Sequence, residues 1–155
     1  MTNAAMTIKM WFSICTSALS NEIEYVQSPS SQEISFLTEQ INLETQELGT
    51  AYRFAFFIRD TDNQIIAGCN GSAIFGVIYT DQLWVHPDHL KLGIGRKLMD
   101  YIQEYGRSLG CKLATVTTLS FQNTRKFYEK LDYKVEFEHP RYTQVSSCLF
   151  LRRSL

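Results

Sequence analysis

Residues 89–96 read HLKLGIGR, and they connect a predicted strand over residues 77–85 to a predicted helix that begins at residue 94. The first N–H groups of a helix have no partner within the helix and carry a partial positive charge. Gly93 and Gly95 lack a Cβ atom, so a bulky anion can approach the backbone closely. Three cations add positive charge: Lys91, Arg96 and Lys97. The loop therefore predicts a phosphate-binding site, with a simple tight turn as the alternative.

The common phosphate-binding motifs do not fit these residues. No G-K-[ST] follows Gly95, which excludes a P-loop. Leu98 occupies the position where G-x-G-x-x-G requires a third glycine, and no acidic residue ends the next strand to bind a ribose. A nucleotide bound by this loop would have to be held by a different arrangement.

Helix and strand signals alternate in the residues that follow the loop. Apolar residues recur at helical spacing until Gly110 ends the predicted helix. These residues are Ile94, Leu98, Ile102 and Tyr105. A strand is predicted over residues 113–118, a helix over residues 120–131, and final strands over residues 133–137 and 142–151.

The residues before the loop predict strands and one long helix. Residues 23–26 alternate as a strand does, and the serines and proline before Glu33 signal the start of a helix over residues 31–48. Strands over residues 52–58 and 64–75 form a hairpin, in which Gly68 and Gly71 suggest a bulge or a close backbone approach. The predicted order is β-α-β-β-β-α-β-α-β-β, which is a mixed α/β sheet with a parallel step in its middle.

A second motif lies late on the following helix, where residues 127–133 read FYEKLDY. Tyr128 carries a phenol with a reference pKa of about 10, which suits a proton donor to a departing thiolate. A helical tyrosine that packs in the core is the alternative.

The two motifs together resemble those of the GNAT superfamily, the acyl-CoA-dependent N-acetyltransferases. In that family a strand is followed by Q/R-x-x-G-x-G/A at a helix start, and a tyrosine then precedes Glu-Lys-Leu-Gly-Phe/Tyr. Residues from about 23 to 153 follow the family's order of elements. The resemblance implies a central mixed sheet of about 6–7 strands flanked by about 3–4 helices, with parallel strands that splay apart at the cofactor cleft.

The resemblance also implies the residues that contact acetyl-CoA. Pantetheine would pair with the strand before the loop, the diphosphate would bind the loop, and Tyr128 would face the thioester sulfur. The implied contacts are Leu83, Trp84, Val85, Leu90, Lys91, Leu92, Gly93, Ile94, Gly95, Arg96, Lys97, Thr118, Ser120, Phe121, Asn123, Phe127 and Tyr128.

The chain departs from the family pattern at two of these contact residues and at one residue that follows Tyr128 in the sequence. Leu90 replaces the Gln or Arg that opens the loop, and Phe121 replaces a common Asn, with Asn123 nearby but out of register. Asp132 replaces a glycine at a site that favours the left-handed conformation, which predicts a cost of roughly 0.5–1 kcal/mol.

The implied reaction is transfer of an acetyl group from acetyl-CoA to a small-molecule or peptide amine, with Tyr128 as the general acid. The general base stays open. Gln82 occupies a common site and cannot take a proton, so Asp81, which is predicted to share a strand face with Tyr79, Leu83 and Val85, competes with a water relay. His86 and His139 are further alternatives. The expected acceptor pocket includes Phe36, Phe75, Tyr79, Trp84 and Tyr142.

Composition limits the other possibilities. The 155 residues suit one domain (1–155), with residues 1–20 as a strand or an appended arm that could mediate a homodimer. A net charge of −1 argues against a nucleic-acid partner, and no stretch has the length that a membrane span needs. Four separated cysteines predict reduced thiols, no metal site and a cytoplasmic location, although residues 9–20 leave a signal peptide open. A non-catalytic acyl-CoA-binding module and an unrelated nucleotide-binding protein remain the rival functions.

Overall fold

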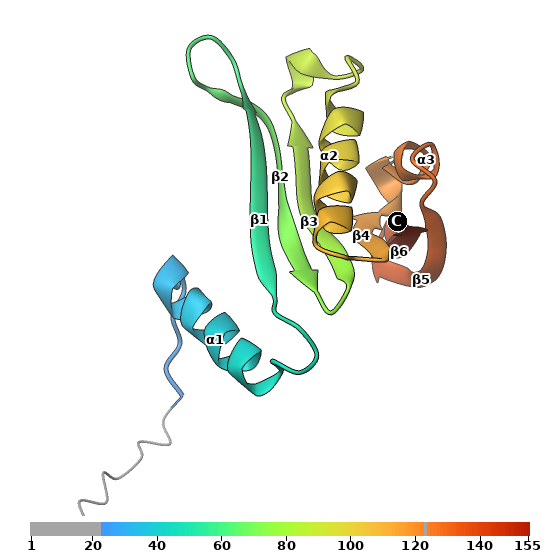
Figure 1. The fold of residues 1–155 in the computed structure, drawn as a ribbon. Coiled ribbons are helices and arrows are strands. Elements are labelled where there is room, and N and C mark those ends of the chain that lie inside the picture. The colour runs from blue at the N-terminus through green and yellow to red at the C-terminus, as the bar shows by residue number, and fades with distance from the viewer. Residues whose placement is uncertain (1–22, 123) are drawn as a thin grey trace, which may run out of the picture.

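The computed structural model describes residues 23–122 and 124–155. They form one six-stranded sheet with the strand order β1-β2-β3-β4-β6-β5, shown in Figure 1. The helices are α1 (Ser31–Glu44), α2 (Ile94–Ser108) and α3 (Thr124–Glu129), with short 3₁₀ turns at Pro87–His89 and Ser120–Gln122. The strands are β1 (Tyr52–Arg59), β2 (Ile65–Ile74), β3 (Val77–Val85), β4 (Leu113–Leu119), β5 (Lys134–Thr143) and β6 (Ser146–Ser154).

A β-bulge interrupts the antiparallel pairing of β2 and β3. Asn70 pairs with Gln82 and Gly71 pairs with Thr80, so Asp81 is the extra residue on β3. A Cβ atom on Gly71 would lie 1.9 Å from the Tyr79 carbonyl oxygen, which explains why this position requires glycine. The bulge that the interior glycines predict is confirmed.

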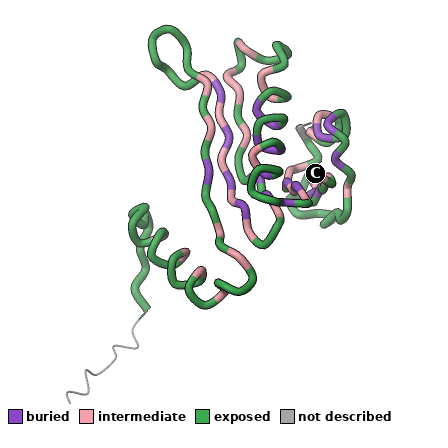
Figure 2. Tube along the Cα trace, viewed as in Figure 1, coloured by how far each residue is buried: buried purple, intermediate pink, exposed green. Residues whose placement is uncertain are grey.

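Helix α2 covers one face of the sheet. Its apolar residues Leu98, Met99 and Ile102 are almost completely buried, and Ile78 of β3 is buried beneath them. Gly106 allows this close approach, because a Cβ atom there would lie 2.9 Å from the Ile78 side chain. Burial of each such side chain contributes about 1.5–3 kcal/mol, so this layer stabilises the packing of α2 on the sheet. Figure 2 shows buried residues along α2 and the strands beneath it.

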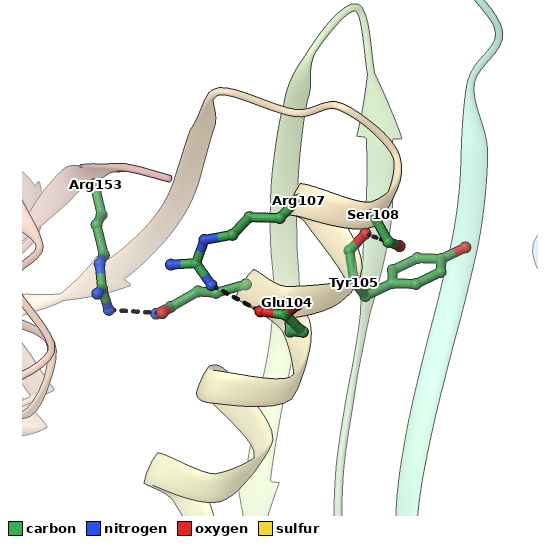
Figure 3. A network of polar contacts seen from close by, with 6 residues as sticks. Glu104, Tyr105, Arg107, Ser108 and Arg153 are labelled. Carbon is green, nitrogen blue, oxygen red and sulfur yellow. Dashed lines mark hydrogen bonds and ion pairs between the residues drawn. The ribbon is translucent and has the colours of Figure 1, made fainter.

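The C-terminal strands complete the sheet and are tied to α2. Strand β6 pairs with β4 on one side and β5 on the other, both antiparallel. Arg153 of β6 donates hydrogen bonds to Gln103 Oε1 (2.6 Å) and to the Leu131 carbonyl (2.9 Å). Figure 3 shows Arg153 extended toward α2, where Arg107 and Glu104 form a separate ion pair of 3.2 Å.

Helix α1 lies beside one end of β1, as Figure 1 shows. Ser30 and Glu33 form the predicted capping box, but no residue of α1 is buried. Asn42 holds the helix to the start of β1 through hydrogen bonds with both backbone groups of Ala51, at 2.8 and 3.3 Å.

Four predicted boundaries are wrong. Residues 23–26 form no strand, and α1 ends at Glu44, so Leu48 lies beyond the helix. The helix predicted over residues 120–131 is a 3₁₀ turn followed by the short α3, and Tyr142 belongs to β5 rather than to the last strand. Residues 1–20, predicted as a strand or an arm, lie outside the described part of the chain.

Candidate active site

The parallel strands β3 and β4 separate in the middle of the sheet. Their pairing begins at Val77 with Leu113 and ends at Thr80 with Val116. Beyond these residues, each strand continues without the other, which confirms the predicted splay. A cavity of about 510 Å³, here called the central cavity, lies at this separation. Its walls include Asp81, Leu83 and Trp84 of β3, Thr117 and Thr118 of β4, and Thr124 and Tyr128 of α3.

Tyr128 is a buried wall of the central cavity. Its side chain is only 6% exposed and packs against the rings of Phe127 and Tyr133, with centroids 5.0 and 5.8 Å away. Burial, with a smaller contribution from Tyr133, raises the pKa of Tyr128 to about 12. The phenol therefore stays protonated at neutral pH and keeps an O–H group that can donate a hydrogen bond or a proton.

A second cavity, here called the loop cavity, has a volume of about 720 Å³ and shares Leu83 with the central cavity. Its other walls come from the end of β3, the glycine-bearing loop, the start of α2, and α3 with the residue that follows it. They are Val85, His89, Leu90, Lys91, Gly93, Ile94, Gly95, Arg96, Lys126, Phe127 and Lys130. Four cations and the start of a helix therefore surround this cavity, which suits a ligand with several phosphate charges.

The backbone at the loop cavity offers free donors. The first hydrogen bond of α2 runs from the Lys97 N–H to the Gly93 carbonyl at 3.0 Å. The N–H groups of Ile94, Gly95 and Arg96 consequently have no acceptor within the helix. Gly93 adopts φ +80° and Lys91 adopts φ +64°, so this turn uses the left-handed conformation twice.

The loop and α3 are in direct contact. A Cβ atom on Gly95 would lie 3.3 Å from the Phe127 ring, so the absence of a side chain at residue 95 allows Phe127 to pack on the start of α2. Since Tyr128 follows Phe127 on α3, the same contact holds α3, the helix that carries the phenol, against the start of α2.

The structure brings most of the predicted contact residues to the two cavities and leaves a few outside. Leu92 lines neither cavity and is 68% exposed. Lys97 also lines neither of them, but it borders a neighbouring hollow that shares Gly93 and Arg96 with the loop cavity. Phe121 is also exposed and lines neither cavity. Asn123 lies outside the described residues.

Ser120 takes part in contacts within the protein. Its N–H donates to Ser146 Oγ at 3.1 Å, and its own Oγ accepts from the Ser147 N–H at 3.0 Å. These bonds join the end of β4 to the start of β6, and Ser120 lines neither cavity.

The bulge determines where the candidate base lies. Leu83 pairs with the buried Cys69, whereas Asp81 is the unpaired bulge residue. The prediction that Asp81 shares a face with Leu83 and Val85 is therefore wrong, because the bulge reverses the alternation of side chains. Asp81 nevertheless lines the central cavity.

The other residues considered for the role of the base are Gln82, which lines the central cavity but cannot take a proton, and two histidines. Gln82 accepts a hydrogen bond from Asn70 at 2.8 Å. His86 and His139 line neither cavity, and His139 lies on β5 at the far edge of the sheet.

Sequence reasoning missed several cavity residues. Asn70 and Cys69 of β2 reach the central cavity across the sheet, and a strand pattern alone does not show which neighbouring strand borders a gap. Lys126 and Lys130 had a usable signal, since two lysines four residues apart on a helix lie on one side of it. Burial raises the pKa of Cys69 to about 11, so this thiol is protonated and unreactive at neutral pH.

Known proteins support this interpretation. A family model described as the acetyltransferase (GNAT) family matches residues 18–133. A protein from Agrobacterium tumefaciens, named as an acetyltransferase, superposes with a TM-score of 0.71 at 20% identity over 87% of this chain and 99% of that chain. An acetyltransferase from Bacillus cereus ATCC 14579 gives a TM-score of 0.67 at 20% identity, over 85% and 98% of the two chains.

A third structure holds the cofactor. A streptothricin acetyltransferase from Bacillus anthracis str. Ames, solved in complex with acetyl coenzyme A, gives a TM-score of 0.60 at 14% identity, over 66% and 62% of the two chains. None of the curated proteins matches the chain. The family match spans most of the sequence, and the three structures share its fold. This chain therefore belongs to the acetyltransferase (GNAT) family.

Proposed function

We propose that this protein transfers an acetyl group from acetyl-CoA to a primary amine by direct attack, with Tyr128 as the general acid. One observation carries the proposal: the central cavity and the loop cavity share Leu83 on the stretch of β3 that β4 does not pair. An elongated substrate that joins a diphosphate to a thioester suits two neighbouring cavities that share a wall residue on a strand edge that β4 leaves unpaired.

The loop cavity supplies the binding groups for the diphosphate. The free N–H groups of Ile94, Gly95 and Arg96 and the cations around them would hold its negative charge. Pantetheine would extend past Val85, Trp84 and Leu83, and the thioester would lie in the central cavity beside Tyr128. The acetyl-CoA complex of the Bacillus anthracis relative supports acetyl-CoA as the substrate.

The reaction needs one proton to move from the amine to the sulfur. The neutral amine attacks the thioester carbonyl carbon, and the tetrahedral intermediate collapses as the C–S bond breaks and its electron pair passes to sulfur. Tyr128 O–H donates a proton to that sulfur and is reprotonated from water, while the amine gives up its own proton to a separate acceptor. Because a phenol of pKa about 12 is a weaker acid than a thiol of about 8.5, its hydrogen bond to the developing thiolate supplies most of the effect.

Asp81 is the proposed acceptor of the amine proton, directly or through a water molecule. It lines the central cavity. Because Asp81 is exposed, water can reach it and carry the proton away.

The test measures release of CoA thiol from acetyl-CoA with a panel of primary amines. We expect Tyr128→Phe to lower kcat by about 10²–10⁴-fold for any amine that the wild type acetylates. Tyr133→Phe is the matched control, because Tyr133 is equally buried, packs against Tyr128 and lines neither cavity. An unchanged kcat for Tyr128→Phe would rule out the acid role. Stabilisation by CoA with no turnover on any amine would favour the non-catalytic acyl-CoA-binding alternative.

A further inference from the structure

A third cavity of about 640 Å³ opens between α1 and the first strands, and it is here called the α1-side cavity. Thr38 of α1, Arg53 of β1 and Ser72 of β2 are among its walls. Asn70 and Asp81 line both this cavity and the central cavity. A small molecule in the α1-side cavity would therefore reach the proposed thioester position past these two side chains.

Arg53 places a fixed positive charge in this cavity. Its Nη2 donates to Thr38 Oγ1 at 3.0 Å and to the Ile34 carbonyl at 3.5 Å, which holds the guanidinium against α1. No carboxylate of residues 23–122 or 124–155 forms an ion pair with Arg53. The other N–H donors of the guanidinium have no acceptor among the described residues, so they can bind a carboxylate of a ligand, whose geometry matches the arginine fork.

Two acceptors lie on the opposite wall. Asp81 forms no ion pair with any cation of the described part of the chain. Asn70 donates to Gln82 Oε1 through Nδ2 at 2.8 Å, which leaves its buried Oδ1 without a partner. An unpaired buried acceptor is unfavourable, and a ligand N–H at this position would satisfy it.

The register of the sheet gives the spacing between the backbone positions of Arg53 and Asp81. Arg53 pairs with Ser72, and Asp81 lies on the next strand between the partners of Gly71 and Asn70. The two residues are separated by two strand spacings across the sheet and by one to two residues along the strand direction. This places the Cα atoms of Arg53 and Asp81 about 11 Å apart. Because both side chains line the same cavity, a ligand that carries an amine and a carboxylate a few bonds apart can contact both of them.

We propose that the α1-side cavity binds the acceptor, and that it selects a small amine that also carries a carboxylate, as a free amino acid does. Arg53 binds the carboxylate, while Asp81 and Asn70 bind the amine and aim it at the thioester. Arg53 repels the second charge of a diamine or polyamine. The inference depends on the proposed acetyl transfer, because it assigns the acceptor of that reaction.

The experiment compares kcat/KM at saturating acetyl-CoA for the twenty free L-amino acids, for their α-amides, and for 1,3-diaminopropane. Each amide keeps the amine and lacks the negative charge, and it also represents a peptide N-terminus. We expect at least one free amino acid to exceed its amide by about tenfold or more, mainly through a lower KM. Arg53→Gln should remove this preference, and Arg53→Glu should reverse it in favour of the diamine.

Arg59→Gln is the matched control, because Arg59 lies on the same strand but binds the Asn63 carbonyl at 2.9 Å and does not line the cavity. Arg59→Gln should leave unchanged the ratio of kcat/KM for the free amino acid to kcat/KM for its amide. Thermal unfolding is measured for each variant to show that it is folded. Equal rates for acids, amides and the diamine, or equal ratios in Arg53→Gln and Arg59→Gln, would overturn the acceptor assignment while leaving acetyl transfer intact. Binding of CoA without thiol release from any amine would overturn both proposals.

Discussion

Arg96 at the start of α2 donates a hydrogen bond of 2.9 Å from Nη2 to the carbonyl of Lys130, 34 residues later in the chain. Lys130 directly follows α3, the helix that carries Tyr128. The loop that would hold the diphosphate and the helix that would serve the thioester are thus joined by one side chain. Binding at one cavity and geometry at the other should consequently change together.

Arg96→Ala tests this link. The substitution removes a cation from the loop cavity and the bond to Lys130, so we expect KM for acetyl-CoA to rise about tenfold and kcat to fall as well. Arg96→Lys keeps the charge without the fork of donors, and it should lie between wild type and Arg96→Ala. Lys97→Ala is the control, since Lys97 is a neighbouring cation that does not line the loop cavity. Equal effects of Arg96→Ala and Lys97→Ala in steady-state kinetics would contradict the link.

Gly71→Ala tests the bulge that places Asp81. The new Cβ atom would lie 1.9 Å from the Tyr79 carbonyl oxygen, so the backbone must move, and we expect a loss of about 3 kcal/mol or more in the free energy of unfolding. Gly76→Ala is the comparison, because its site has φ +82° and no atom within 4 Å of the new Cβ. Strain alone should cost about 1 kcal/mol there. Urea unfolding measures both, and similar losses would show that the close approach at residue 71 is unimportant.

The raised pKa of Tyr128 predicts a fall in stability at high pH. The phenol ionises near pH 10 in the unfolded chain and near pH 12 in the folded protein, so the unfolded state loses its proton first. Stability from this group is complete below pH 10 and is lost between about pH 10 and 12, with a total of about 2–3 kcal/mol. Tyr128→Phe should lack this component in urea unfolding at pH 9 to 12. If the free energy of unfolding changed with pH in the same way in wild type and in Tyr128→Phe, burial would not shift this pKa.

Asp132→Gly should stabilise the protein. Asp132 has φ +63° at the end of α3, where the Tyr133 N–H bonds to the Tyr128 carbonyl at 3.1 Å. Glycine adopts this left-handed conformation without strain, which favours the variant by roughly 0.5–1 kcal/mol. The ion pair lost with Arg153 is long, at 3.7 Å, and Asp132 is 83% exposed, so it offsets little. A lower midpoint of thermal unfolding in Asp132→Gly would contradict this account of the turn.

The sequence allowed the order of elements from α1 to β6 to be predicted, because glycine, proline and helical spacing act locally. Gly110, for example, ends α2 with φ +78°, as its position predicts. The face on which Asp81 lies could not be predicted in the same way. A bulge adds one residue to β3, and only the pairing with β2 shows that alternation reverses between Thr80 and Leu83.

The acceptor pocket shows the same limit. Trp84 lines the central cavity, whereas Phe36, Phe75, Tyr79 and Tyr142 line neither the central nor the α1-side cavity. Aromatic composition indicates apolar surface but not which strand lies beside which. The residues that do line the α1-side cavity, Arg53 and Asn70 among them, come together only through the register of three strands.

Among the described helices, none combines the length and hydropathy needed to cross a membrane.

The most direct test is a crystal structure with bound CoA, in which the distance from Tyr128 Oη to the CoA sulfur is measured. We predict a separation within about 4 Å, with the diphosphate on the N–H groups of Ile94, Gly95 and Arg96. A sulfur atom beyond hydrogen-bonding reach of the phenol, or a diphosphate bound away from the loop, would contradict the proposed mechanism.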